Sequence, residues 1–533
     1  MPFSAKAGND AKRATSVGRS AFLVAAGILL SRIAGLVRER ILAYFFGTTY
    51  AADAFRAALK IPNFLQNLFG EGTLSASFIP VYAKLQAQGE KEEAGRVAGA
   101  IFSLLAVITS LMVLAGVLAT PWLVTVIAPG FAGETQRLTI QLVRILFPGV
   151  GFLVLSSWCL GILNSHGRFF LSYASPVVWN AAVIGALIWY GGRSELSYLA
   201  VYGIWGSVAG SLLQLLIQLP VVLRLAPGIR LGFGLANQNV RTIIANFTPV
   251  FVSRGVVQLS AYVDTVLASP LPTGAVAALG YAQTIYLLPV SLFGMAVSAA
   301  ELPGMSSALG NEQQIAETLR TRILSSTRRI GFFVVPSAVA FFSLGDIVAG
   351  AIYQTGKFGH AQSVNVWGIL AGSAVGLVAS TVGRLYSSAY FALRDTRTPL
   401  RFAVLRVALT TGLGYFAALQ LPKLLGIDPK WGVAGLTASA GFAAWVEFLL
   451  LRRGMERRIG RIQFPAAYFA RLWLAAVTSA ALAWGIKIAM HPQQPQIAAL
   501  MVLLPYGLAY FGLTAALGIE QAASLAARIL RRR

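Results

Sequence analysis

Long apolar stretches, separated by short polar connections, run along almost the whole chain. A membrane-spanning helix needs about 20 predominantly apolar residues, and about fourteen segments meet this length. They lie near residues 20–46, 51–83, 97–120, 138–163, 169–190, 197–223, 242–269, 274–308, 323–348, 363–392, 399–421, 431–451, 466–489 and 496–519. The pattern therefore predicts an all-α polytopic membrane protein with about fourteen transmembrane helices.

The composition agrees with this class, because 56% of the 533 residues are hydrophobic and only 12% are charged, unlike an ordinary soluble domain. One cysteine, Cys159, and three scattered histidines, His166, His360 and His491, predict neither a disulfide framework nor a metal site. No common catalytic or nucleotide-binding motif is present, and the connections are too short for a catalytic domain. We therefore expect a protein that is not an enzyme and has no cofactor.

The formal net charge of +24 follows the expected topology. Lys and Arg gather at both ends of the chain and in one set of alternate connections. These basic connections contain Lys84, Arg168, Arg224, Arg320, Arg394 and Arg452. Because basic loops stay on the cytoplasmic side, both termini are expected in the cytoplasm and the number of crossings is expected to be even. No basic stripe interleaved with aromatic residues is present, so nucleic acid is not an expected partner.

Charged residues also lie inside the apolar segments, chiefly in the run from Ser31 to Pro80. This run contains Arg32, Arg38, Glu39, Arg40, Asp53, Arg56, Lys60 and Glu71. Later segments add Arg254, Asp264, Glu301 and Arg384. A charge near the centre of a bilayer costs about 2.5–3.5 kcal/mol. We therefore expect these side chains to face a water-filled cavity, which is typical of a transporter.

Two parts of the chain share a weak internal repeat. Residues 53–80 contain an aspartate, a helix that reaches a proline, an FG step, a small-residue stretch and a second proline, and residues 264–303 contain the same features in order. Transporter folds commonly arise from such repeats, although chance recurrence of Pro and Gly is the alternative. The repeat predicts two pseudo-symmetric lobes, 20–225 and 242–452. The remaining parts are a cytoplasmic N-terminal tail (1–19), two C-terminal helices (466–519) and a basic cytoplasmic tail (520–533).

The charged run also carries a resemblance to a known family. SRIAGLVRERILAYFFGTTYAADAFRAALKIPN (31–63) and LFGEGTLSASFIPVYAKL (68–85) are similar to the first two transmembrane helices of the MurJ (MviN) lipid II flippases, in the multidrug/oligosaccharidyl-lipid/polysaccharide exporter superfamily. APGF (128–131), YQTGKFG (353–359) and YFALRDTRTPLRFA (390–403) resemble further family segments in the expected order. The resemblance extends over essentially the whole chain.

This resemblance implies two six-helix lobes around a central cavity, with helices thirteen and fourteen forming a groove for a polyprenyl tail. It also implies the cargo, a lipid-linked anionic peptidoglycan precursor, which is a polyprenyl pyrophosphate that bears sugar and peptide. Such a cargo moves from the inner to the outer leaflet. By position, the charged substrate-binding residues of the family match Arg32, Arg38, Asp53, Lys60 and Glu71.

The chain departs from the family pattern at three places. Gln66 and Asn67 stand where family members often have paired arginines, and residues 282–285 (AQTI) stand where they often have ADRL. Glu301 occupies a position that is usually apolar or small. Arg254, one helix before the AQTI segment, is the candidate substrate-binding residue that replaces the lost cation.

Arginine suits this cargo because its planar guanidinium group donates two parallel hydrogen bonds to phosphate oxygens. Arg32 and Arg38 are six residues apart in the chain, so their directions around a helix differ by roughly 120°. Both can address one site if Gly35 permits a bend or if the cavity is broad. Arg40 is expected at the periphery, and a solvated outer helix end is the alternative interpretation for residues 38–40.

The acidic residues of the run are interpreted as gates or partners. Asp53 and Glu71 would hold the arginines when no cargo is bound, and a helix cap is the alternative for Asp53. Lys60 closely precedes Pro62, so we expect a broken helix that directs Lys60 into the cavity.

The sequence thus predicts a lipid II flippase that works by alternating access in the bacterial cytoplasmic membrane, as a monomer among membrane lipids. The membrane potential, at about 2.3 kcal/mol per charge per 100 mV, or a monovalent ion gradient is expected to drive it. Asp264 either pairs with Arg254 or forms a site for such an ion. The alternatives are a flippase for another lipid-linked oligosaccharide, a small-molecule antiporter of the same superfamily, and a scaffold that binds anionic lipid.

Overall fold

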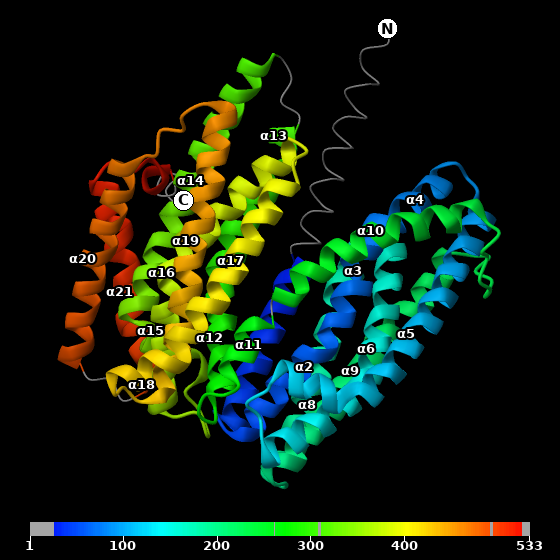
Figure 1. Cartoon of the computed structure of the whole chain (residues 1–533), viewed down its shortest axis with the longest axis horizontal. Coiled ribbons are helices and arrows are strands. Elements are labelled where there is room, and N and C mark those ends of the chain that lie inside the picture. Colours follow the sequence, from blue (N-terminus) through cyan, green and yellow to red (C-terminus); the bar gives the residue numbers. More distant parts are fainter. Residues whose placement is uncertain (1–25, 261, 307–310, 491–493, 525–533) are drawn as a thin grey trace, which may run out of the picture. The chain divides into compact units, whose positions relative to one another are not determined.

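The structure, a computed structural model, describes residues 26–260, 262–306, 311–490 and 494–524 (Figure 1). Within these ranges the regular structure is helical, apart from an isolated bridge between Thr355 and Phe358. A helix satisfies its backbone hydrogen bonds within one segment, which is what a chain in lipid requires. The prediction of an all-α protein is confirmed.

By its contacts the chain divides into two compact units, Met1–Val266 and Leu267–Arg533. The described part of the first unit begins with a helix over residues 26–46. The helices that follow are α2 (Tyr50–Phe69), α3 (Glu71–Ser77), α4 (Ile79–Ala87), α5 (Lys91–Ile127), α6 (Gly133–Ser165), α7 (Phe169–Ala174), α8 (Pro176–Tyr190), α9 (Leu196–Leu225), α10 (Gln238–Ser260) and α11 (Val263–Ala268), which spans the boundary.

The helix α6 lies at the centre of the first unit, where it packs against α2, α5 and α9. Its Trp158 is buried, and the indole Nε1 donates to the backbone oxygen of Ala98 on α5 at 3.1 Å. On another side, Gln214 Nε2 of α9 donates to Ser156 Oγ at 3.0 Å, and Ser156 Oγ donates to Gln218 Oε1 at 3.3 Å. Because these buried groups satisfy one another, the polar chain aligns α6 with α9.

The second apolar segment is divided into three helices, α2, α3 and α4. The break after α2 lies at Gly70, whose backbone is extended (φ −80°, ψ −153°). A Cβ atom there would lie 2.1 Å from the backbone oxygen of Gln66, so the position requires glycine. The break expected at Pro62 is wrong, because α2 continues to Phe69. Proline removes a single N–H donor, and membrane helices tolerate that loss.

The second unit contains the remaining helices. They are α12 (Ala275–Pro289), the π-helix η1 (Val290–Met295), α13 (Ala296–Ser306), α14 (Glu312–Ser343), α15 (Gly345–Tyr353), α16 (His360–Ala392), α17 (Arg397–Tyr415), η2 (Phe416–Gln420), α18 (Leu421–Leu425), η3 (Pro429–Trp431), α19 (Gly432–Ile459), α20 (Ala466–Met490) and α21 (Pro495–Ala516). The helices α14 and α15 meet at a bend of 86°. The helices α16 and α19 cross closely, since a Cβ atom at Gly376 would lie 2.3 Å from Cα of Gly441.

The helices α20 and α21 pack against each other and against α14 and α15 (Figure 1). Pro336 in α14 has no N–H to donate to the oxygen of Phe332, one turn earlier. The hydroxyl of Tyr510 on α21 donates to this free oxygen at 2.7 Å, and the hydroxyl of Tyr506 donates to the oxygen of Pro336 at 2.7 Å. The proline therefore leaves free the acceptor through which α21 is bonded to α14.

Among the described residues, ten helices are long and apolar enough to span a membrane, or eleven if the bent pair α14 and α15 is one span. The chain is therefore a multi-pass membrane protein. The predicted count of fourteen is not confirmed by length and hydropathy. The segments outside this set are those near 20–46, 51–83 and 242–269. These three contain most of the charged residues singled out in the sequence, and part of the first lies outside the described residues.

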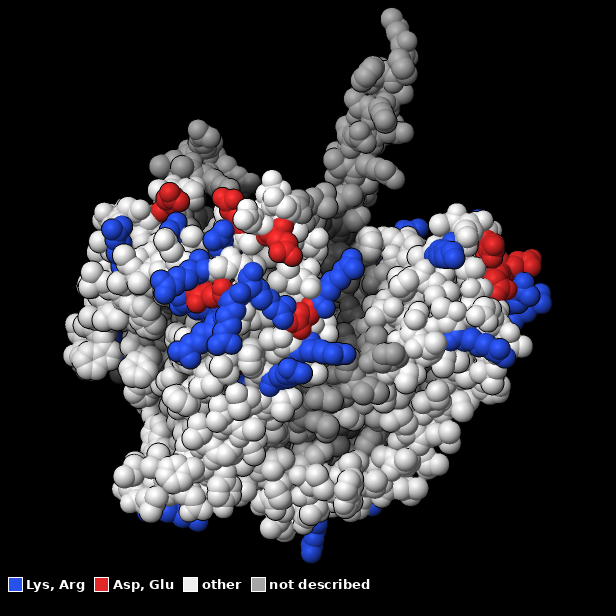
Figure 2. Space-filling view, turned by 45° about the horizontal axis from the view of Figure 1, so that its top comes forward, with Lys and Arg blue, Asp and Glu red and all other residues white. Residues whose placement is uncertain are grey.

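Charge is concentrated at one end of the second unit. Figure 2 shows its lysine and arginine side chains gathered in a band above a belt with few charges. The end of α19 and the start of α17 meet there, because Arg458 Nη2 lies 2.5 Å from Asp395 Oδ2 in the turn before α17. An uncharged belt beside a basic end is the arrangement that a membrane-spanning unit requires.

The helix α10 was predicted to belong to the second lobe, but its contacts lie in the first unit. We expected residues 242–452 to form the second lobe, whereas α10 packs against α2, α3 and α5 and belongs by contacts to the first unit. The repeat-based lobes stay a prediction. The two FG steps of the repeat do share an interruption of the α-helical backbone, since α2 ends before Gly70 and η1 contains Gly294.

Asp395 stabilises the turn between α16 and α17. Its carboxylate accepts hydrogen bonds from the backbone N–H groups of Arg397 and Thr398, both at 3.0 Å, and from the Thr398 hydroxyl at 2.7 Å. The bonds from Thr398, followed by the charge of Arg458, lower the pKa of Asp395 from 3.8 to about 2. Because the folded-state pKa is the lower one, this stabilisation is present above about pH 4 and is lost as the pH falls through about 2.

We expect Asp395→Asn to lower the free energy of unfolding at neutral pH by up to about 1 kcal/mol, because the amide keeps an acceptor oxygen but loses the charge that pairs with Arg458. Thermal unfolding of the purified protein in detergent measures this difference. The difference between wild type and variant should shrink as the pH falls toward the lowered pKa. A difference that stays constant from neutral pH down to about pH 2.5 would contradict the role of the carboxylate charge.

Candidate functional site

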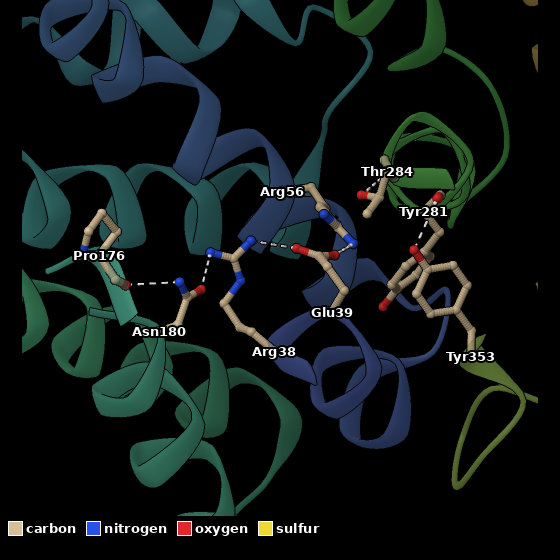
Figure 3. Close-up of polar contacts among 9 residues, drawn as sticks. Arg38, Glu39, Arg56, Pro176, Asn180, Tyr281, Thr284 and Tyr353 are labelled. Carbon is tan, nitrogen blue, oxygen red and sulfur yellow. Dashed lines mark hydrogen bonds and ion pairs between the residues drawn. The ribbon is translucent and has the colours of Figure 1, made fainter. Parts of the chain in front are cut away.

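Glu39 is the centre of a buried charge cluster in the first unit. Only 4% of its side chain is exposed. Its Oε1 accepts a hydrogen bond from Nη2 of Arg38 at 2.7 Å, and its Oε2 forms an ion pair with Nη2 of Arg56 on α2 (Figure 3). We call these three residues the Glu39 cluster. Two guanidinium groups share one carboxylate, so the cluster has a net positive charge and attracts anions.

Arg38 is oriented by α8 as well as by Glu39. Its Nη1 donates to Oδ1 of Asn180 at 3.1 Å, and Nδ2 of Asn180 donates to the backbone oxygen of Pro176 at 2.9 Å (Figure 3). The guanidinium carbon also lies 4.8 Å from the ring centroid of Trp179, a favourable cation–π distance. The Nε of Arg38 is buried and has no hydrogen-bond partner in the described part of the chain. Arg38 is thus held in place, while the described residues leave one of its N–H groups unsatisfied.

A second set of contacts joins α2 to α11. The Nζ of Lys60 donates to Oγ1 of Thr265 at 2.7 Å, and the hydroxyl of Tyr262 donates to the backbone oxygen of Lys60 at 2.9 Å. Asp264, the neighbour of Thr265, is half-buried in α11. Lys60 is therefore fixed through both its side chain and its backbone.

The other predicted residues of the first two helices have different surroundings. Arg32 is exposed and forms no ion pair within the described ranges, whereas Arg38 is half-buried, as expected for directions that differ by roughly 120°. Asp53 is buried in the first turn of α2, but the N-cap residue of that helix is Thr49. Asp53 is therefore not the N-cap residue itself, and its role in the site stays a prediction.

Two predicted site residues cannot be placed in this arrangement. Glu71 begins α3 and Arg254 belongs to α10, but the side chains of both lie outside the described residues. Their substrate-binding roles stay predictions.

The structure adds members that the predicted site did not contain. Glu39, which was not among the predicted partners, is a carboxylate that holds Arg38 and Arg56. The gating roles of Asp53 and Glu71 stay predictions. A signal for Arg56 was present, because spacings of three and four residues place it on one face of a helix with Asp53 and Lys60. Nothing local signals Asn180, which lies 142 positions from Arg38 in the chain.

The chemistry available to the Glu39 cluster is electrostatic. In the described part of the chain no group of three or more His, Cys, Asp and Glu side chains could hold a metal ion. Guanidinium groups instead bind carboxylate or phosphate oxygens through paired, charge-assisted hydrogen bonds. The arrangement can therefore hold an anion that competes with Glu39.

Comparison with protein families gives one match that covers most of the chain. Residues 42–507 match the family model described as "Lipid II flippase MurJ". The "Probable lipid II flippase MurJ" of Rhizobium meliloti is 32% identical over 438 residues, which cover 80% of this chain and 78% of the relative. The "Lipid II flippase MurJ" of Burkholderia cenocepacia is 28% identical over 522 residues, which cover 95% of this chain and 98% of the relative.

Solved structures share the fold. The structure titled "Lipid II flippase MurJ, inward closed conformation" has a TM-score of 0.76 at 22% identity, and the match covers 93% of this chain and 98% of that chain. An inward-facing multidrug resistance MATE family transporter of the MOP superfamily has a TM-score of 0.63 at 17% identity, with coverage of 79% and 98%. At these identities the likeness concerns the fold alone.

Proposed function

The chain belongs to the lipid II flippase MurJ family, and from this membership we propose that it moves a lipid-linked peptidoglycan precursor from the inner to the outer leaflet of the bacterial cytoplasmic membrane. The observation that carries the proposal is the Glu39 cluster, in which Arg38 and Arg56 share one buried carboxylate. A diphosphate has the charge and the oxygens to engage two guanidinium groups. The precursor supplies that diphosphate between its polyprenyl tail and its sugar.

In this proposal Glu39 is an internal counter-ion. It keeps Arg38 and Arg56 paired when no cargo is bound, because two unpaired cations in a buried place would be costly. An arriving diphosphate replaces the carboxylate, so the arginines exchange one anion for another. The further substrate-binding residues of the proposal are Arg32, Asp53, Lys60, Glu71 and Arg254.

Transport in this proposal requires no covalent chemistry and no cofactor. The two lobes alternate access to the cargo, with both termini in the cytoplasm and the protein acting as a monomer. A membrane potential that is negative inside favours outward movement of the anionic head group by about 2.3 kcal/mol per charge per 100 mV. A monovalent ion at Asp264 is the second proposed source of driving force.

Genetic replacement tests the function directly. Cells depleted of their own lipid II flippase should grow when they express this chain, and the protein in proteoliposomes should move labelled lipid II between leaflets. Failure of both assays with correctly inserted protein would contradict the proposal that lipid II is the cargo.

The AQTI segment at 282–285 favours another lipid-linked oligosaccharide as the second candidate cargo. Movement of that class of lipid without movement of lipid II would support it.

A further inference from the structure

Arg384 is a cation in a membrane segment of the second unit, and it forms no ion pair with the residues that the structure describes. It lies in α16, one of the helices long and apolar enough to span a membrane. Its side chain is exposed, and the described residues place no carboxylate within ion-pair distance of it. Charged groups inside membrane segments face water-filled space and mark binding sites far more often than they face lipid. The charged guanidinium group of Arg384 therefore requires contact with either water or a bound ligand.

The neighbouring contacts show which way this part of α16 faces. Ser380 lies one turn before Arg384, on the same face of the helix. The hydroxyl groups of Ser380 and of Tyr286 on α12 form a hydrogen bond of 2.8 Å. The face that carries Arg384 is therefore directed toward another helix and its hydroxyl groups.

A second arginine lies near Arg384 and is already positioned. Nη1 of Arg406 on α17 forms an ion pair of 3.1 Å with Oε2 of Glu447 on α19, whose side chain is 14% exposed. Arg384 interacts electrostatically with Arg406, Glu447 and Tyr286. Two guanidinium groups with one carboxylate give this group a net positive charge. The Glu39 cluster likewise has two arginines and one carboxylate, but here Arg384 forms no direct ion pair with a carboxylate of the described residues.

We propose that Arg384 binds an anionic group of the transported precursor, at a site completed by Arg406, which Glu447 positions, and by the hydroxyl groups of Tyr286 and Ser380. The inference rests on the proposed function and names a second anion-binding site, within the second unit. The precursor contains two anions of suitable chemistry, the diphosphate and the carboxylates of its peptide. Arg384 also supplies a cation to the unit in which the AQTI segment lacks one.

Binding of two probes to the purified full chain tests the site. The probes are lipid II and a polyprenyl diphosphate that lacks sugar and peptide. We expect Arg384→Ala to weaken the binding of lipid II by about tenfold or more, which is the effect of one lost hydrogen bond to a charged group. Arg384→Lys should recover part of the affinity because it keeps the charge. Arg401→Ala is the matched control, since Arg401 is an exposed arginine of α17 outside the site.

The outcomes distinguish the diphosphate from the peptide carboxylates as the bound anion. They also distinguish a failure of the Arg384 site from a failure of the proposed function. Weaker binding of both probes to Arg384→Ala assigns the site to the diphosphate, and weaker binding of lipid II alone assigns it to the peptide carboxylates. Equal affinity of Arg384→Ala and Arg401→Ala, at equal thermal stability, overturns the inference while the proposed function stands. Failure of the wild-type protein to bind lipid II overturns the proposed function and this inference together.

Discussion

Cells that depend on this chain as their lipid II flippase are expected to stop growing when Arg38 is replaced by alanine. Arg38→Ala removes the guanidinium group that Glu39, Asn180 and Trp179 together orient. Loss of one partner in a buried, hydrogen-bonded charge pair costs about 2–5 kcal/mol of binding, so transport of labelled lipid II in proteoliposomes should fall by about a hundredfold. Glu39 keeps Arg56 as its partner, and the protein should therefore still fold and insert.

The control for this prediction is Arg137→Ala, which removes an exposed arginine from the start of α6 in the same unit. Both variants should reach the membrane in equal amounts, and only Arg38→Ala should lose transport. Arg32→Ala is a companion test, because Arg32 is exposed and has no ion pair to lose in the described part of the chain. Normal transport by both Arg32→Ala and Arg38→Ala would contradict the assignment of these arginines to the substrate-binding site.

Glu39→Ala is expected to destabilise the protein more than removal of either arginine. Without the carboxylate, Arg38 and Arg56 become neighbouring cations whose side chains are only 18% and 14% exposed. Removing one partner of a buried ion pair typically costs about 3–5 kcal/mol. Thermal unfolding in detergent should show a large drop in the midpoint, or the variant should accumulate poorly in the membrane.

A double-mutant cycle tests the physical reason for this drop. Glu39→Ala/Arg56→Ala removes one of the two unpaired cations, so it should be less destabilised than the sum of the single variants, with a coupling of about 1–3 kcal/mol. Additive effects would show that Glu39 stabilises the unit by packing rather than by charge. In that case its proposed role as a counter-ion would be wrong.

The helical membrane architecture follows from local properties of the chain. A run of about 20 apolar residues has few ways to bury its backbone in lipid other than as a helix, which is why most predicted segments agree with helices of the structure. The positions of breaks were harder to predict. Pro62 was expected to interrupt α2, but the interruption lies at Gly70, where the nearby oxygen of Gln66 leaves no space for a Cβ atom. That distance depends on how the chain turns, and residue type alone does not reveal it.

The candidate site, too, was predicted in part from the sequence, whereas its contacts became clear only from the structure. The sequence indicated that the first two helices hold charges that need a cavity, because the cost of a charge in lipid applies to any fold. It also gave the different directions of Arg32 and Arg38 from helical geometry alone. It did not identify Glu39 as the shared partner, since three carboxylates lay within the same run and spacing along the chain could not rank them.

The sequence by itself therefore determined the helical class, most of the membrane segments, the charged helices and the family of this protein. Tertiary structure alone decided the partners, such as Asn180 for Arg38 across 142 positions, Tyr510 for the free oxygen of Phe332, and Glu447 for Arg406. The physical reason is that helical periodicity fixes the direction of a side chain around its own axis. Which helix lies in that direction is decided by packing over distances in the chain that no local pattern reaches.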